Sequence, residues 1–142
     1  MKTRFRISLA LCVATILPGI ASAASLTCAI TPGNVSGPGW CSSSQPNDPY
    51  SASYAVTGLA PGTYTFVWSK TNIPGSKSTP SVSGCTMATC AQNLSSWHNW
   101  VAQNVSVAVT NTATGVVQNF DVDVTIDAVC LGLPPGGGYA WC

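Results

Sequence analysis

Charged residues are scarce in this 142-residue chain, where they make up 6% of the sequence, and glutamate is absent. The basic residues are Lys2, Arg4 and Arg6 near the start, and Lys70 and Lys77 further along. Proteins that bind nucleic acids or anionic membrane surfaces neutralise phosphates with clustered Lys and Arg. The chain has no such cluster beyond its sixth residue, so we expect neither nucleic acid nor an anionic membrane as a partner. A surface this poor in charge favours self-association.

Catalytic and metal-binding side chains are also few. His98 is the sole histidine, and the only acidic residues are aspartates. Acid–base catalysis depends on positioned titratable groups, and a Ser-His-Asp triad drawn on His98 has no G-x-S-x-G context to select its serine. The cysteines form no C-x-x-C pair, which disfavours a redox site or a structural zinc site. We therefore expect a protein that is not an enzyme and takes no metal or cofactor, with a His98-dependent hydrolase as the catalytic alternative.

Most of the acidic residues form one row. Asp121, Asp123 and Asp127 have even spacing and therefore project from one face of a predicted strand. Calcium takes oxygen ligands, but residues two apart on a strand stand about 7 Å from each other. That distance is too long for a shared site unless a facing loop adds carboxylates, and only Asp48 remains. We interpret the row as a solvated face that resists aggregation.

The first 23 residues have the pattern of a secretory signal peptide. Three basic residues are followed by an uncharged apolar run over residues 7–20 and by an Ala-Ser-Ala triplet. A Pro-Gly pair interrupts the run, which is shorter than the roughly 20 residues needed to span a bilayer. We predict cleavage before Ala24, which leaves residues 24–142 as a single secreted or periplasmic domain that does not insert into a membrane.

No segment repeats apolar residues at a helical spacing, whereas several alternate apolar and polar residues as half-buried strands do. Tyr64, Phe66 and Trp68 project from one face of such a segment, which predicts a core strand with Trp68 buried. Strands are expected over residues 26–31, 50–57, 63–69, 105–110 and 120–128, and loops over residues 31–49 and 70–84. The pattern predicts an all-β fold, a disulfide-stapled antiparallel β-sandwich that is immunoglobulin-like and has Greek-key connections.

An even set of cysteines follows the predicted cleavage site: Cys28, Cys41, Cys85, Cys90, Cys130 and Cys142. An even set in an oxidising compartment indicates disulfide bonds. The short spacing pairs Cys85 with Cys90. Nearest-neighbour pairing would also join Cys28 with Cys41 and Cys130 with Cys142, while a crossed scheme, such as Cys28 with Cys130 across two sheets, remains open.

The segment Leu59-Ala-Pro-Gly62-Thr-Tyr64 lies between two predicted strands. It resembles the Leu-x-Pro-Gly-x-Tyr corner of fibronectin type III and immunoglobulin-like domains, and it is similar to the corresponding turn of transthyretin-like extracellular modules. The resemblance covers a small part of the chain. It implies a β-sandwich in which Leu59 packs beneath the corner and the Tyr64 hydroxyl bonds to nearby backbone. It implies no particular function.

Aromatic side chains are the main candidates for a contact surface. Trp97, His98 and Trp100 lie in a polar segment without a strand pattern, beside several amides. Indole rings cover the apolar patches of sugars while amides bind the hydroxyls, and Trp is equally suited to protein interfaces. The alternative is that one or both indoles close the end of the sandwich.

The C-terminal segment is a second candidate surface, because it carries Tyr139 and Trp141 after a run of Pro and Gly. A bond from Cys142 back to Cys130 would close this segment and present both rings. Trp40 and Trp141 each adjoin a cysteine, where packing of the indole on a disulfide is the ordinary structural explanation.

These features favour a non-catalytic binding or adhesion module that recognises a glycan or an extracellular protein through loop aromatics. A structural subunit of an extracellular surface assembly is the first alternative, favoured by low charge and by strands rich in Thr and Val. A small protease inhibitor is the second alternative. In it the Cys85–Cys90 loop would place Thr86 or Met87 in a protease, because a closed loop loses little entropy on binding.

Overall fold

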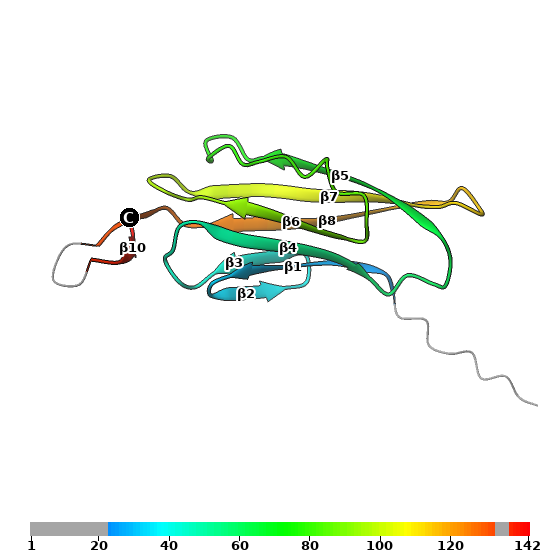
Figure 1. Cartoon of the computed structure of the whole chain (residues 1–142), viewed down its shortest axis with the longest axis horizontal. Coiled ribbons are helices and arrows are strands. Elements are labelled where there is room, and N and C mark those ends of the chain that lie inside the picture. Colours follow the sequence, from blue (N-terminus) through cyan, green and yellow to red (C-terminus); the bar gives the residue numbers. More distant parts are fainter. Residues whose placement is uncertain (1–22, 133–136) are drawn as a thin grey trace, which may run out of the picture.

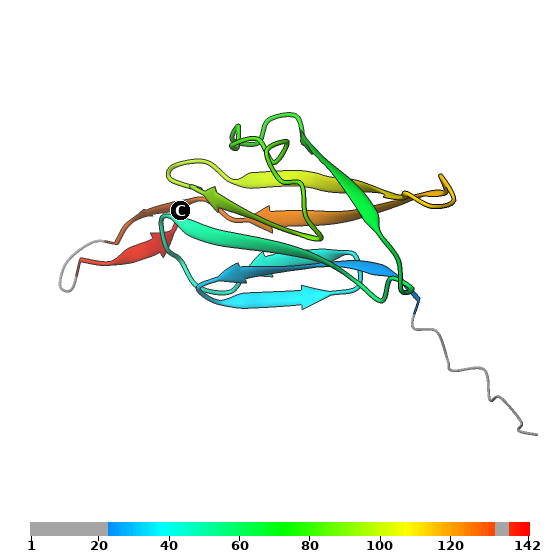
Figure 2. The same ribbon diagram turned by 45° about the vertical axis from the view of Figure 1, so that its right-hand side comes forward.

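The computed structural model describes residues 23–132 and 137–142 (Figure 1). Within these residues the chain forms strands and no helix, and two sheets pack face to face around one core (Figures 1 and 2). No helix in this part of the chain is long and apolar enough to cross a membrane. The predicted signal peptide falls almost wholly outside the described residues.

The two sheets differ in size. The three-stranded sheet has the order β1 (Ser25–Thr31), β4 (Tyr50–Thr57), β6 (Thr89–Leu94). The five-stranded sheet has the order β2 (Asn34–Gly37), β3 (Trp40–Ser43), β8 (Val117–Ile126), β7 (Val101–Asn111), β5 (Tyr64–Asn72). A separate hairpin joins β9 (Val129–Leu131) to β10 (Tyr139–Trp141). This arrangement is the predicted disulfide-stapled all-β sandwich.

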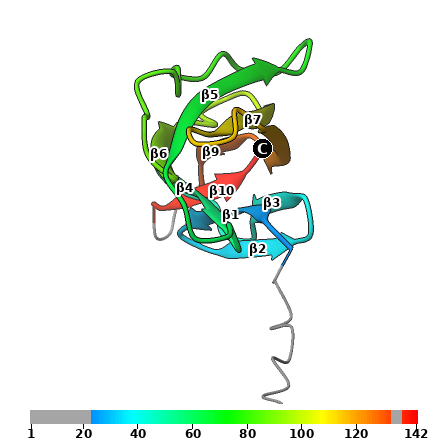
Figure 3. The ribbon, with the colours of Figure 1, turned by 90° about the vertical axis from the view of Figure 1, so that its right-hand side faces the viewer.

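The chain passes repeatedly from one sheet to the other. Each of the links β3 to β4, β4 to β5, β5 to β6 and β6 to β7 changes sheet, so that the strands enclose the core when viewed along the long axis (Figure 3). Among the described strands, β3 and β8 pair in parallel, and the other pairs are antiparallel as predicted. A parallel pair requires a long connection, which the intervening strands supply.

The prediction that residues 31–49 form a loop is wrong over residues 34–43, where β2 and β3 form a hairpin. The hairpin turns at Pro38 and Gly39, and Gly39 has a φ of 78°, a conformation that favours glycine. Each strand has four residues, too few to show a periodic pattern. β6 was not among the predicted strands, because buried Gln92 stands at one of its core positions and hides the alternation of apolar and polar residues.

The corner between β4 and β5 has the contacts that its resemblance implies. The Tyr64 hydroxyl donates a hydrogen bond to the Ala60 carbonyl oxygen at 3.0 Å, and Leu59 packs against the core. Gly58 begins the corner with a φ of 74°. Because β4 and β5 belong to different sheets, this corner fixes where the chain leaves one sheet for the other.

The core consists of the alternating inner-face residues of both sheets. Trp68 is buried as predicted, and its ring lies 6.2 Å from that of Tyr54, centroid to centroid. The aliphatic part is supplied mainly by β1, β7 and β8, through Leu26, Ile30, Val105, Val107, Val109, Val122, Val124 and Ile126. Burying such side chains stabilises the fold by about 1.5–3 kcal/mol each.

A hydrogen-bond network crosses the middle of this apolar core. Gln103 on β7 donates from Nε2 to the Tyr54 hydroxyl at 3.1 Å and to Gln92 Oε1 at 2.7 Å. Tyr54 in turn donates to Gln92 Oε1 at 2.9 Å, and Gln92 Nε2 donates to the Pro80 carbonyl oxygen at 2.5 Å. Gln103 Oε1 accepts a hydrogen bond from the Thr79 hydroxyl. The network therefore joins both sheets to the segment that precedes β6.

The three disulfides follow the nearest-neighbour scheme, so the crossed scheme is excluded. Cys28–Cys41 joins β1 to β3 and thereby ties the two sheets together. Cys85–Cys90 closes the loop before β6, and Cys130–Cys142 closes the C-terminal hairpin. Disulfides of this density are typical of small domains in oxidising compartments.

Replacement of the central glutamine is expected to destabilise the fold. Gln103→Leu leaves the Thr79 hydroxyl and Gln92 Oε1 each short of a buried partner, so the free energy of unfolding should fall by about 1–3 kcal/mol in urea titrations. Gln118→Leu, at an exposed position of β8, is the matched control and should change stability by no more than about 0.5 kcal/mol. Equal stability of the two variants would show that the network does not stabilise the sandwich.

Stability is also expected to fall in alkali. Burial raises the pKa of Tyr54 far above its usual value and raises that of Tyr50 as well. Both phenols stay neutral in the folded protein while their unfolded counterparts ionise near about pH 10. Their contribution to stability is therefore complete below that pH and is lost as the pH rises above it, at up to about 1.4 kcal/mol per pH unit for Tyr54.

Urea unfolding between pH 8 and pH 11.5 measures this loss, and Tyr54→Phe isolates one of the two groups. The variant should be less stable at pH 8, because a buried hydrogen bond is gone, but its stability should decline less steeply above pH 10. Burial also lowers the pKa of Lys70. The effect of Lys70 on stability is the same in the parent protein and in Tyr54→Phe, so it does not alter the difference between their pH profiles. Parallel pH profiles for the two proteins would contradict the assignment to Tyr54.

Candidate functional site

The β9–β10 hairpin projects beyond one end of the sandwich (Figure 1). Its register pairs Tyr139 with Leu131 and Trp141 with Val129. Residues that pair directly across antiparallel strands point to the same side, so these four side chains share one face. The Cys130–Cys142 disulfide lies on the opposite face. The predicted closed C-terminal segment is therefore confirmed.

Backbone hydrogen bonds attach the hairpin to the loop that links β6 and β7. The His98 amide donates to the Val129 carbonyl oxygen at 2.9 Å, and the Val129 amide donates to the Ser96 carbonyl oxygen at 3.0 Å. At the same end of the hairpin, the Cys142 amide donates to the Ala128 carbonyl oxygen at 2.9 Å, which continues the pairing beyond Trp141 and Val129. The two candidate segments of the sequence analysis thus meet at one end of the molecule.

Three of the predicted aromatic residues form a cluster there. The Trp97 and Tyr139 rings lie edge to face with 6.0 Å between their centroids, and Trp97 and His98 lie edge to face at 4.6 Å. Such pairs add about 0.5–1.5 kcal/mol beyond the area they bury. His98 has a φ of 58°, a left-handed conformation that non-glycine residues adopt mainly in turns and at functional positions.

The hairpin face is apolar, and three of its four side chains are open to solvent. The exposed fractions are 68% for Leu131, 40% for Tyr139 and 38% for Trp141, while Val129 is buried. We call Trp97, His98, Leu131, Tyr139 and Trp141 the hairpin-end surface. Sequence reasoning missed Leu131, because the three residues of β9 are too few to reveal which face they present.

Trp100, the remaining predicted site residue, lies elsewhere. Its backbone carbonyl oxygen accepts a hydrogen bond from the Lys77 amide at 2.9 Å, and its indole lies next to Gly75. Trp100 therefore packs beside the turn that follows β5 and takes no part in the ring cluster. The prediction that it accompanies Trp97 in one surface is not supported by this placement.

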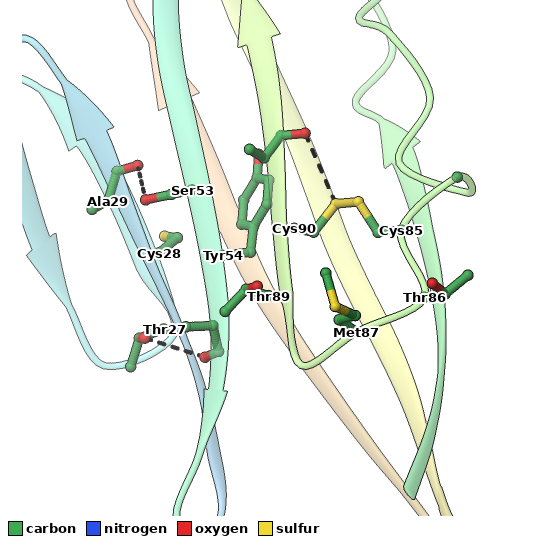
Figure 4. Close-up of a pocket in the computed structure, with 13 residues that line it drawn as sticks. Thr27, Cys28, Ala29, Ser53, Tyr54, Cys85, Thr86, Met87, Thr89 and Cys90 are labelled. Atoms are coloured by element: carbon green, nitrogen blue, oxygen red, sulfur yellow. Dashed lines mark hydrogen bonds between the residues drawn. A yellow bond between two sulfur atoms is a disulfide. The ribbon is translucent and has the colours of Figure 1, made fainter.

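A concave surface lies on the outer face of the three-stranded sheet (Figure 4). It has a volume of about 690 Å³. Small side chains of the three strands form its floor, and the loop closed by Cys85–Cys90 forms one side. The small floor residues are Thr27, Ala29, Ser53, Ala55, Thr89 and Ala91. No charged side chain lines this groove.

The Cys85–Cys90 loop presents Met87, which is 68% exposed, at the side of the groove (Figure 4). A protease-inhibitor loop must offer the carbonyl of its primary contact residue to the protease, where backbone amides bind that oxygen. The Met87 carbonyl oxygen instead accepts a hydrogen bond from Trp68 Nε1 at 2.9 Å. With its carbonyl turned toward the core, Met87 is poorly suited to that role.

The aspartate row lies on the outer face of the five-stranded sheet. Asn104 on β7 donates from Nδ2 to Asp123 Oδ1 at 3.0 Å and to Asp121 Oδ2 at 3.3 Å. Asp127 follows the end of β8. Within residues 23–132 and 137–142, no three His, Cys, Asp or Glu side chains are grouped to hold a metal ion.

Comparison of the chain with protein-family models, with curated proteins and with solved structures finds no significant match.

Removal of the terminal disulfide is expected to release β10. Two-stranded hairpins are marginal in water, and the ladder here has three residue pairs. In Cys130→Ser/Cys142→Ser the amides of β10 should lose protection from hydrogen exchange, and acrylamide should quench tryptophan fluorescence more strongly than in the parent protein. In the control Cys85→Ser/Cys90→Ser, the β10 amides should stay protected. Unchanged protection in the first variant would show that the disulfide does not hold this surface.

Proposed function

We propose that the protein is a secreted, non-catalytic binding or adhesion module that recognises an extracellular protein through the hairpin-end surface. The observation that carries the proposal is the exposure of Leu131, Tyr139 and Trp141 on one face of a disulfide-closed hairpin. Contiguous exposed apolar side chains are typical of interaction sites, and Trp and Tyr are enriched among the residues that dominate binding energy.

The chemistry of this surface favours a protein over a sugar. Its rings meet edge to face, and Leu131 adds an aliphatic side chain. His98 is its main polar group, so it offers few partners for sugar hydroxyls. Because the disulfide and the hydrogen bonds to Val129 fix the hairpin, little conformational entropy is lost on binding.

Secretion is supported by two independent features. The first 23 residues have the signal-peptide pattern, and the three disulfides suit an oxidising compartment. The sheet-changing connections and the Tyr64–Ala60 corner support an immunoglobulin-like assignment of the sandwich.

A photo-crosslinking experiment tests the proposed surface. Tyr139→benzoylphenylalanine, in the full chain expressed in the cells that export it, should crosslink to another extracellular protein. The same group at Gln118, near the start of β8 and therefore far along that strand from β9, is the positional control and should not. Adding Leu131→Ser and Trp141→Ala should reduce the crosslinked product at least about tenfold, because both apolar anchors are lost. Equal crosslinking from positions 139 and 118, or none from position 139, would contradict the proposal.

A structural subunit of a surface assembly is the second candidate, favoured by the uncharged, small-residue face of the three-stranded sheet. This function requires that the chain pairs with itself. Sedimentation of the oxidised mature protein over a wide concentration range distinguishes the candidates. Reversible growth of oligomers, together with crosslinks between two copies of the chain, would favour the assembly.

A further inference from the structure

We propose that the outer edge of β5 pairs with the same edge of a second copy of the chain and forms a closed dimer. The two five-stranded sheets would then join into one continuous sheet. The pairing is antiparallel and centred on Val67, and we call residues 64–70 the β5 edge. It shares no residue with the hairpin-end surface, so the two proposals stand or fall separately.

The backbone of β5 is paired on one side only. β5 is the last strand of the five-stranded sheet, and β7 is its partner (Figure 3). The Thr112 amide donates to the Thr63 carbonyl oxygen and the Ile73 amide to that of Ala102. Because bonded and free positions alternate along an antiparallel strand, the even-numbered residues of β5 point away from β7. These outward N–H and C=O groups, which have no hydrogen-bond partner among the residues that the structure describes, belong to Tyr64, Phe66, Trp68 and Lys70.

Proteins protect sheet edges with short strands, charges or covering segments, and the other edges of this sandwich have such protection. β2 has four residues, and β6 is bonded by a disulfide to the segment before it. The Ile30 amide of β1 donates to the Asn34 side chain, and the part of β8 beyond β3 carries Asp121. Residues 64–69 contain neither a charge nor a proline. Among the described strands, β5 therefore has the least protected edge.

Apolar side chains along this edge are left partly uncovered. Val67 is 65% exposed on the outer face, where its neighbour on β7 is the small Ala108. Phe66 lies on the inner face and packs against the core, yet it is only half-buried. A further strand at this edge would cover both side chains while it pairs with the free backbone groups.

An antiparallel register centred on Val67 suits two identical strands. It places Phe66 opposite Trp68 of the second copy, and Tyr64 opposite Lys70, so that free groups meet free groups and exchange hydrogen bonds. Val67 meets its own counterpart in a non-hydrogen-bonded pair, where side chains approach most closely. The two Lys70 residues stand about 20 Å apart along the strands, so like charges do not meet.

A second copy is a better partner for this edge than a disordered peptide. Strand addition gains main-chain hydrogen bonds, but a disordered peptide loses backbone entropy for each residue that it orders. β5 of a second copy is already extended, and its free groups have the matching order. Because both copies use the same edge, the interface is isologous and stops at two copies. It thus differs from the growing oligomers of a surface assembly.

Sedimentation of the oxidised mature protein tests the dimer, which should be populated at concentrations up to about 1 mM. Amide hydrogen exchange measured by NMR identifies its interface. The Phe66 and Trp68 amides should exchange freely in dilute protein, and their rates should fall in proportion to the fraction of monomer. The Thr65 and Val67 amides, which face β7, should be protected at every concentration.

Val67→Lys should weaken dimerisation at least about tenfold, because two ammonium groups would face each other across the central pair. The fold should persist, since the side chain points to solvent, and circular dichroism checks this. Val35→Lys is the matched control. It adds the same charge to a 43% exposed valine on β2, at the opposite edge of the same sheet, and should leave dimerisation unchanged.

Four outcomes would overturn the proposal: no dimer at about 1 mM, growth beyond two copies, a dimer that leaves the Phe66 and Trp68 amides unprotected, or equal dimerisation of Val67→Lys and the parent. If Val67→Lys did not fold, hydrogen exchange in the parent protein would decide alone. None of these outcomes bears on crosslinking of another protein from position 139.

Discussion

Gln103 occupies a core position between the two sheets, where an amide without partners would cost about 1–3 kcal/mol. It is satisfied only when Tyr54 on β4, Gln92 on β6 and Thr79 are all in place. Apolar contacts tolerate small shifts of one sheet over the other, but this network admits one alignment. It also holds the strandless segment before β6 against the sandwich, since Pro80 accepts from Gln92 and Thr79 accepts from Lys70.

Each disulfide lies beside an exposed part of the surface. Cys28–Cys41 anchors the strand that carries Trp40, Cys130–Cys142 closes the hairpin that carries Tyr139 and Trp141, and Cys85–Cys90 closes the loop beside the groove. A chain with so few charges has little means of ordering its loops by ion pairs. The disulfides order these segments in place of ion pairs.

The strands that form the centre of the sandwich were predictable because their inner faces are apolar and regularly spaced. Trp68 and the valines of β7 and β8 show this pattern plainly. Short spacing predicted the Cys85–Cys90 bond, while the other two bonds stayed open between a nearest-neighbour and a crossed scheme. The hairpin of β2 and β3 was not predictable, because four-residue strands have no readable period. The outward position of Trp40, which is 42% exposed, depends on that hairpin, so the sequence offered no sign of it. The buried positions of Gln92 and Gln103 could not be predicted for another reason. A polar residue at a core position interrupts the apolar pattern of a strand, and its burial is expected only when its hydrogen-bond partners are known.

The parallel pairing of β3 with β8 has a consequence for the order in which the molecule is completed. The two strands are separated by most of the domain, so during synthesis β3 has no neighbour on that side until residues 117–126 have emerged. The five-stranded sheet therefore closes after the three-stranded sheet, whose last strand ends at Leu94, and an N-terminal fragment that ends before β8 cannot form it. Because this pair lies inside the sheet, it joins the β2–β3 hairpin to β8, β7 and β5, and that connection forms only after β8 has been synthesised.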